Sequence, residues 1–307
     1  MDLLSRAIDE LGLRSAAFLR FHLATVPWGL AYGAGVQGMH VVERGQCVLR
    51  VGVTSTPLDA GDLVIVPGGA AHELHSPGRR PSPTDAQSLQ AQHRGEGPVM
   101  LGPVKTTPTC ELVCGALEFE AKDHPMLGSL PPVIHVRRAQ LRDATRLGVW
   151  VDALIDEVTK KTAGSDALVA RLSELILIEA LRLQGQHEGE CPSGGWFRGL
   201  RDPSLARALS AFHQAISEPW TVEALASQAG QSRSVFAARF SSVMGEAPLA
   251  YVTRWRMFHA RRLLRTTRDS LAEVAAQVGY GSAAALSLAF SRAHPMTPGE
   301  YRHHHTS

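Results

Sequence analysis

The pattern of apolar and polar positions divides the chain into a strand-rich part and a helical part. In residues 1–130, short apolar runs alternate with Gly, Pro and Asp, and the clearest runs are 39–42, 47–53, 63–66 and 112–119. Such runs predict β-strands separated by turns. The stretch 76–98 is rich in Pro, Ser, Gln and Gly and has no hydrophobic period, so we expect a mobile loop there.

Apolar positions recur at helical spacing between residues 140 and 186. A first stripe runs from Leu147 to Val158, and a second runs from Leu168 to Leu183 after a break at Gly164. The second helix is apolar on two sides, which fits either simple packing on the strands or a homodimer through residues 165–184. Residues 187–199, rich in Gly, Glu and Ser, are expected to form a linker.

The last hundred residues contain two copies of one pattern. Apolar and small residues precede a glycine in each copy, and two bulky apolar residues follow: Leu225, Ala226, Gln228, Gly230, Phe236 and Phe240, then Val274, Ala275, Gln277, Gly279, Leu286 and Phe290. Each copy ends in Pro-x-x-Tyr, at 248–251 and 298–301. Agreement at so many positions indicates a duplicated structural unit.

Each copy has the features of a helix-turn-helix. Gly230 or Gly279 ends a short helix, where a left-handed backbone favours glycine. Ser232 or Ser282 can then cap a second helix, and Ser270 with Glu273 forms a capping-box pattern. The two units are expected at about 222–244 and 271–294. A helix of about eighteen residues from Pro248, roughly 27 Å long, would join them. This length can hold the two recognition helices about one DNA turn, roughly 34 Å, apart on the same face of the duplex.

The charge of the last hundred or so residues also indicates a polyanionic partner. Residues 201–307 hold 12 arginines, no lysine and 7 acids, whereas residues 1–200 carry a surplus of three negative charges. No apolar run reaches the roughly 20 residues of a membrane span, and the N-terminus is unlike a secretory signal, so we expect a cytoplasmic protein. Four cysteines are too few for a disulfide scaffold.

The stretch from Trp220 to Met257, followed by Ser270 to Arg302, closely resembles the DNA-binding domain of the AraC/XylS regulators. The resemblance covers about residues 205–303. It implies double-stranded DNA and RNA polymerase as partners. By this resemblance Ser234, Ala237, Ala238 and Arg239 meet bases or phosphates, with Arg233 at the start of the first recognition helix; the matching positions of the second unit are Ala284, Ser287 and Leu288, and Arg254 and Arg256 of the long helix are further DNA-contact candidates.

Three positions depart from the family pattern. The family usually has a basic residue at Ala238 and at Leu288, and a glycine at Pro295. Leu288 can make neither a bidentate guanine contact nor a phosphate pair. We therefore expect the second unit to bind weakly or by shape, with sequence readout concentrated in the first.

The segment from Gly61 to His72 matches the second cupin motif, glycine-x5-Pro-x-Gly-x2-His, and residues 39–52 resemble a degenerate first motif. The resemblance implies a cupin-type N-terminal domain of a branch of AraC regulators that includes reactive-chlorine sensors. The expected fold is therefore α+β: a cupin-like β-barrel or double sheet at 1–135, a helical connector at 136–200 and an all-α DNA-binding domain at 201–307. In relatives the barrel interior can hold a ligand.

Two further chemistries are candidates in this domain. His40 and His72 could converge on a metal ion, although the first motif lacks its usual His-x-His, and satisfied histidines are the alternative; we expect no cofactor. Cys110 and Cys114 could sense oxidants, although on one strand they would stand about 13 Å apart, too far for a direct disulfide without Cys47 or Cys191 as partner. Buried, inert thiols are the alternative.

The function that follows is a sequence-specific transcription regulator, not an enzyme, whose activity responds to a small ligand or a redox signal at the N-terminal domain. A cupin metalloenzyme fused to a DNA-binding tail and a non-specific DNA-binding protein are the alternatives. The degenerate cupin motif argues against the first, and the elaborate N-terminal domain argues against the second.

Overall fold

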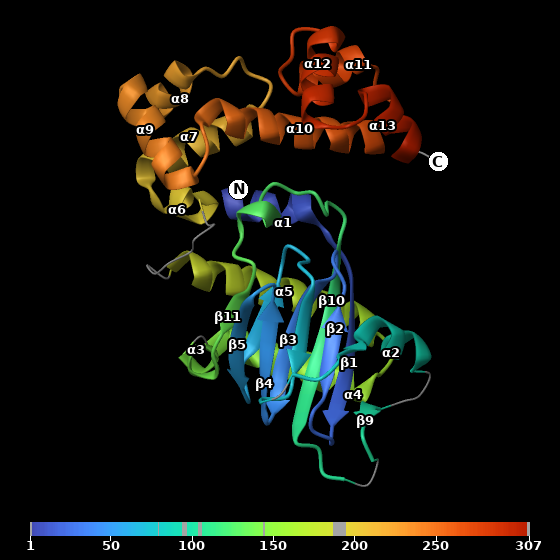
Figure 1. Cartoon of the computed structure of the whole chain (residues 1–307). Coiled ribbons are helices and arrows are strands. Elements are labelled where there is room, and N and C mark those ends of the chain that lie inside the picture. The colour runs from blue at the N-terminus through green and yellow to red at the C-terminus, as the bar shows by residue number, and fades with distance from the viewer. Residues whose placement is uncertain are drawn as a thin grey trace. The chain divides into compact units, whose positions relative to one another are not determined.

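A computed structural model describes residues 2–78, 80–93, 97–103, 106–143, 145–186 and 195–305 (Figure 1). The chain forms two compact units. The strand unit comprises residues 11–122 and 130–191, and the helical unit comprises residues 1–10, 123–129 and 192–307. This division differs from the three parts expected, because the connector helices belong with the strands and two N-terminal segments belong with the C-terminal helices.

Two sheets build the strand unit. One has the strand order β11-β6-β3-β10-β1-β9, with β1 at Leu13–Leu23, β3 at Gln37–Arg44, β6 at Leu63–Val66, β9 at Val99–Leu101, β10 at Cys110–Phe119 and β11 at Ile134–Val136. The other has the order β5-β4-β7-β2-β8, with β2 at Gly29–Tyr32, β4 at Gln46–Val51, β5 at Thr54–Asp59, β7 at His72–His75 and β8 at Thr84–Asp85. All four clear strand predictions are confirmed. The sheets stay separate, so the double sheet is correct and the closed barrel is not.

Alternation of side chains places one apolar face of each sheet inside. Phe21 and Leu112 of the six-stranded sheet share a core with Leu30, Leu49 and Leu74 of the five-stranded sheet, and all five are at most 2% exposed. The space between the sheets is therefore filled by side chains.

Two stretches depart from the sequence-based expectation. The supposed loop at 76–98 contains β8 and helix α2 (Ala86–Gln92), because the Asp85 side chain caps the helix by accepting a hydrogen bond from Ser88 N at 2.7 Å. Residues expected as strand and turn at the N-terminus form helix α1 (Leu3–Leu11), with Ala7, Ile8 and Leu11 on its buried side. Both are short helices whose periodicity spans too few turns to stand out in the sequence.

Three helices complete the strand unit: α3 (Arg138–Asp143), α4 (Thr145–Lys160) and α5 (Ser165–Gln186). The predicted break is present, with Gly164 at φ +91°. Helix α5 packs on α4, β1 and β11. Leu168 and Leu175 nevertheless stay exposed on its far side, and the homodimer through this helix remains a prediction.

The helical unit contains α6 (Gly195–Arg201), α7 (Pro203–Gln214), α8 (Val222–Ala229), α9 (Arg233–Met244), α10 (Pro248–Thr266), α11 (Leu271–Gln277), α12 (Ala283–Ala293), α13 (Pro298–His305) and a short 3-10 turn at Leu127–Ser129. Helix α6 occupies part of the expected linker, whose residues 187–194 lie outside the described ones. Within the described ranges, no helix combines the length and apolar character needed to cross a bilayer.

Candidate nucleic-acid interface and sensor-unit site

The predicted turn chemistry is present in both helix-turn-helix units. Gly230 and Gly279 adopt φ +68° and +80°. Residues 270–273 form the predicted capping box, and Ser282 caps α12 through its side chain. Ser232 occupies the N-cap position of α9 but makes no side-chain capping bond. The sequence thus determines the turn of each unit and the starts of α11 and α12.

The second helix of each unit buries one side and exposes the other. Phe236 and Phe240 of α9, and Leu286 and Phe290 of α12, are at most 1% exposed. The exposed residues on the opposite side of α9 include Arg233, Ser234, Val235, Ala238 and Arg239. Four of the five first-unit residues predicted to meet DNA therefore face solvent, and Ala237 is half-buried.

The corresponding face of α12 is mainly apolar. Ala284 and Leu288 are exposed as predicted, whereas Ser287 is half-buried. Ala285 and Arg292 lie on the same exposed surface and were missed by the sequence analysis. Their spacing from the buried Leu286 and Phe290 was the signal that would have placed them there.

An ion pair holds Arg239, the central basic residue of α9. Its Nε lies 2.5 Å from Asp202 Oδ2, and Asp202 also caps α7 by accepting hydrogen bonds from the backbone N–H groups of Ser204 and Leu205. Desolvation raises the pKa of Asp202, but hydrogen bonds from Ser204, Arg239 and Leu205 outweigh it and lower the pKa to about 2. The side chain of Arg239 is 52% exposed, so the ion pair orients it at the surface without covering it.

Arg256 has a structural role, which overturns the expectation that it contacts DNA. It is 9% exposed, and its guanidinium donates hydrogen bonds to the carbonyl oxygens of Ile216 and Glu218. It also lies over the Tyr280 ring, 5.9 Å from the centroid. Because α10 carries it, Arg256 connects the loop before the first helix-turn-helix to the turn of the second.

Other arginines of α10 are engaged inside the helical unit. Arg254 pairs with Glu246 and donates to the Pro125 carbonyl at 3.1 Å. Arg261 pairs with Asp123 at 2.6 Å, and Arg265 lies 3.7 Å from the same carboxylate. A phosphate contact by Arg254 would require these bonds to exchange, and it remains a prediction.

His40 and His72 converge between the sheets, as the cupin resemblance implied. Their Nε2 atoms are 2.9 Å apart, and the Tyr32 ring stacks on His72. Desolvation, and then the neighbouring His72, hold the pKa of His40 well below its usual value. Within the described ranges, no three His, Cys, Asp or Glu side chains gather as metal ligands. Two imidazoles do not fit a zinc site, which takes three or four protein ligands.

The three described cysteines are buried together in the core of the strand unit. A hydrogen bond with Cys110, followed by desolvation, raises the pKa of Cys47 well above its ordinary value. Burial raises the pKa of Cys114 to about 12. Since the thiolate is the reactive form, these environments oppose fast oxidation. Cys191 lies outside the described residues.

We expect mild hypochlorite to leave Cys114 unmodified in the folded protein, because its thiol is buried and protonated. If any intrachain disulfide forms, it should join Cys47 to Cys110, the pair in hydrogen-bond contact. Mass spectrometry of tryptic peptides, with urea-unfolded protein as control, measures both outcomes. Rapid modification of Cys114, or a Cys110–Cys114 disulfide, would contradict this assignment.

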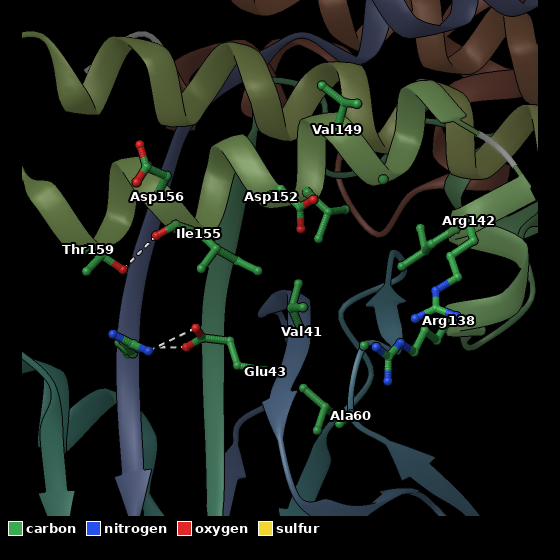
Figure 2. Close-up of a pocket in the computed structure, with 16 residues that line it drawn as sticks. Val41, Glu43, Ala60, Arg138, Arg142, Val149, Asp152, Ile155, Asp156 and Thr159 are labelled. Carbon is green, nitrogen blue, oxygen red and sulfur yellow. Dashed lines mark hydrogen bonds and ion pairs between the residues drawn. The ribbon is translucent and has the colours of Figure 1, made fainter.

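A pocket of about 780 Å³ lies between the connector helices and the outer face of the six-stranded sheet (Figure 2). Its apolar lining includes Val41 from β3 and Leu141, Val149, Val151 and Ile155 from α3 and α4. Val149 is 60% exposed although it is apolar. Val149 thus offers the pocket apolar surface that the fold leaves uncovered.

Charged groups border this apolar surface. Arg20 is held by Glu43, with Nε 2.6 Å from Oε2. Arg138 and Arg142 project from α3 on one side of the view, away from Asp156 on the other (Figure 2). Both arginines are exposed, and neither guanidinium has a carboxylate partner in the part of the chain that the structure describes. The pocket therefore combines an apolar floor with two arginines that can bind an anion, and the exposed carboxylate of Asp152 lines it as well.

Comparison with known proteins identifies both parts of the chain. A family model described as Cupin matches residues 2–184, and one described as Helix-turn-helix domain matches residues 225–304. An AraC-like transcription regulator of Streptomyces antibioticus is 34% identical over 287 residues, covering 90% of each chain. The regulator AlkR of Acinetobacter baylyi is 31% identical over 323 residues, covering 98% of this chain and 99% of its own.

Two further similarities concern a transcriptional activator and a solved structure. RclR of Escherichia coli, named an RCS-specific transcriptional activator, is 29% identical over 289 residues, covering 90% of this chain and 88% of its own. The DNA-binding domain of AdpA, solved with a target DNA, is 37% identical, with 33% of this chain and 91% of that chain covered and a TM-score of 0.32.

The duplicated helix-turn-helix, the exposed second helices and the relatives that match along most of the chain all indicate a DNA-binding transcription regulator. The relatives are named as transcription regulators rather than enzymes. The chain belongs to the AraC family of transcription regulators and is a sequence-specific DNA-binding regulator with a cupin N-terminal domain.

Proposed function

We propose that a small molecule controls DNA binding by this regulator, and that it binds in the pocket lined by α3, α4 and the six-stranded sheet. The observation that carries the proposal is the pocket of about 780 Å³, which the exposed Val149 and the half-buried Ile155 line together with Arg138 and Arg142. Sites for small organic molecules are concave and largely apolar, with a few polar groups that orient the ligand.

The interior of the double sheet is a poorer site. The cavity next to Tyr32 and Cys114 measures about 20 Å³, which is room for about one water molecule. A depression of about 990 Å³ between β1 and the α4–α5 loop is lined by small residues, by charged side chains of both signs and by Leu13, Phe18, Val158 and Val169. We favour the α4 pocket because it holds two arginines without a carboxylate partner among the described residues, whereas both arginines of the depression form ion pairs.

The chemistry of the pocket favours an amphipathic carboxylate. Arginine binds a carboxylate through two parallel hydrogen bonds, and an apolar body would cover Val41, Val149 and Ile155. A ligand that binds one arrangement of α3 and α4 more tightly than another shifts the population toward it. The relative RclR is named RCS-specific, but the three cysteines that the structure describes are buried, which favours a ligand signal over an oxidant at these positions.

At the DNA, we propose that α9 enters one major groove and α12 the next. Helix α10 has 19 residues, roughly 28 Å at 1.5 Å per residue, which suits grooves about one turn apart. Arg233, Ser234 and Arg239 would supply polar readout in the first groove. We further propose that the protein contacts RNA polymerase and that it forms a homodimer through α5. Sedimentation of the Leu168→Arg protein tests the homodimer, because a charge at this exposed position of α5 should convert dimers to monomers.

The experiment combines footprinting with matched variants. DNA beside the regulator's own gene is footprinted with and without octanoate or benzoate, and melting is followed with the same probes and with their neutral amides. We expect the carboxylates, not the amides, to raise the melting temperature and to change DNA affinity. Arg138→Gln with Arg142→Gln should abolish both effects, whereas Arg44→Gln, an exposed arginine outside the pocket, should preserve them. Equal responses of the two arginine variants, or no response by native protein to any carboxylate, would reject this pocket.

A further inference from the structure

Large apolar side chains are exposed on both recognition helices. In the described part of the helical unit, three such side chains face solvent: Val235 on α9 at 56%, Leu249 on α10 at 44% and Leu288 on α12 at 57%. Two of the three therefore lie on the helices that face DNA. Neither has a role in packing, since the opposite sides of α9 and α12 form the cores.

On α12 the apolar side chain is part of a continuous face. Ala284, Ala285 and Leu288 are all exposed, and their spacing of one and three residues places them on one side of the helix. Arg292 is the first basic residue on this side and lies one turn further on. The first two turns of α12 thus present methyl groups and no long hydrogen-bond donor or acceptor.

This composition restricts what the helix can read in a major groove. Guanine, adenine and cytosine are recognised there through hydrogen bonds, whereas thymine also presents its C5-methyl group. An exposed leucine that follows two exposed alanines by one helical turn matches the methyl and cannot satisfy the polar edges of the other bases. We infer that Leu288, supported by Ala284 and Ala285, reads thymine methyl groups in the second half of the operator.

The inference changes the expectation for the second unit. With leucine instead of a basic residue at position 288, the second unit loses a charged contact but gains recognition of thymine methyl groups. The second unit therefore keeps a sequence preference. Val235 would add the same kind of contact beside the polar residues of α9. An operator of this protein should then be richer in thymine steps at the α12 half-site than at the α9 half-site.

Uracil substitution isolates the contact, because it removes the methyl group and leaves the base-pairing edge unchanged. The full-length protein is titrated against the footprinted operator with each thymine of the α12 half-site replaced in turn by deoxyuridine. We expect the affinity for the operator to fall about fourfold when uracil replaces a thymine whose methyl group contacts Leu288. This factor corresponds to about 0.8 kcal/mol, the free energy of burying one methylene-sized group. Thymines at the flanks should give no loss.

Leu288→Ala completes a double-mutant cycle. This variant should bind the thymine operator about fourfold more weakly than native protein and should no longer distinguish thymine from uracil. Leu249→Ala, an exposed leucine of the same unit outside both recognition helices, should match native protein in both respects. Circular dichroism checks that each variant is folded.

Two results would overturn the inference. One is equal affinity of native protein for every thymine and uracil operator. The other is a Leu288→Ala protein with native DNA affinity and reduced transcription in vitro, which would assign the apolar face to a protein contact with RNA polymerase.

Discussion

Replacing Arg239 by alanine should weaken binding to the operator by about 5- to 150-fold, the range of one bidentate base contact of about 1–3 kcal/mol. The side chain of Arg239 is 52% exposed on the outward face of α9, and its guanidinium is oriented by Asp202. Fluorescence anisotropy at fixed salt, with the operator and with random DNA, measures the change. Affinity for the operator should fall much more than affinity for random DNA, because a base contact contributes to sequence specificity and little to the electrostatic attraction between protein and any DNA.

Arg239→Lys serves as the matched control. Lysine keeps the charge but lacks the planar fork, so a base contact should be recovered only in small part, whereas a phosphate contact should be recovered largely. Asp202→Asn retains an N-cap residue on α7 while removing the ion pair, and it tests whether Asp202 orients the arginine. Unchanged operator affinity of Arg239→Ala would place this helix outside the groove.

Gly279→Ala should destabilise the helical unit by about 2–4 kcal/mol, in the upper range of single substitutions. The residue adopts φ +80°, and an added Cβ would lie 2.7 Å from the Ser217 carbonyl oxygen as well as against the Arg256 guanidinium. Relief of this overlap would displace the turn of the second helix-turn-helix from Arg256. Urea unfolding of the full-length protein, followed by tryptophan fluorescence, measures the loss.

Gly245→Ala separates backbone strain from crowding. Gly245 ends α9 at φ +76°, and no atom lies within 4 Å of an added Cβ. Only the left-handed conformation is then unfavourable, at about 1–2 kcal/mol. Equal destabilisation by the two substitutions would show that the contact with Ser217 and Arg256 is unimportant.

The arginines of α10 and the histidine pair of the strand unit show which contacts the sequence could predict and which it could not. Arg256 and Arg254 have the same residue type on one helix, yet only Arg256 is enclosed, by carbonyls forty residues earlier in the chain. His40 and His72 were paired in advance because a motif indicated their positions. The pocket at Arg138 had no such motif, because its walls come from β1, β3, α3 and α4 and are assembled only by folding.

The sequence by itself determined the duplicated helix-turn-helix, its caps and turns, the long α10 and most strands. These features depend on interactions between residues a few positions apart, such as helical periodicity, capping side chains and left-handed glycines. Tertiary structure alone decided that the sheets do not close, that Cys47 contacts Cys110, that Arg256 is structural and that a pocket forms outside the sandwich. Each of these outcomes requires segments distant in sequence to meet, and no local pattern encodes that meeting.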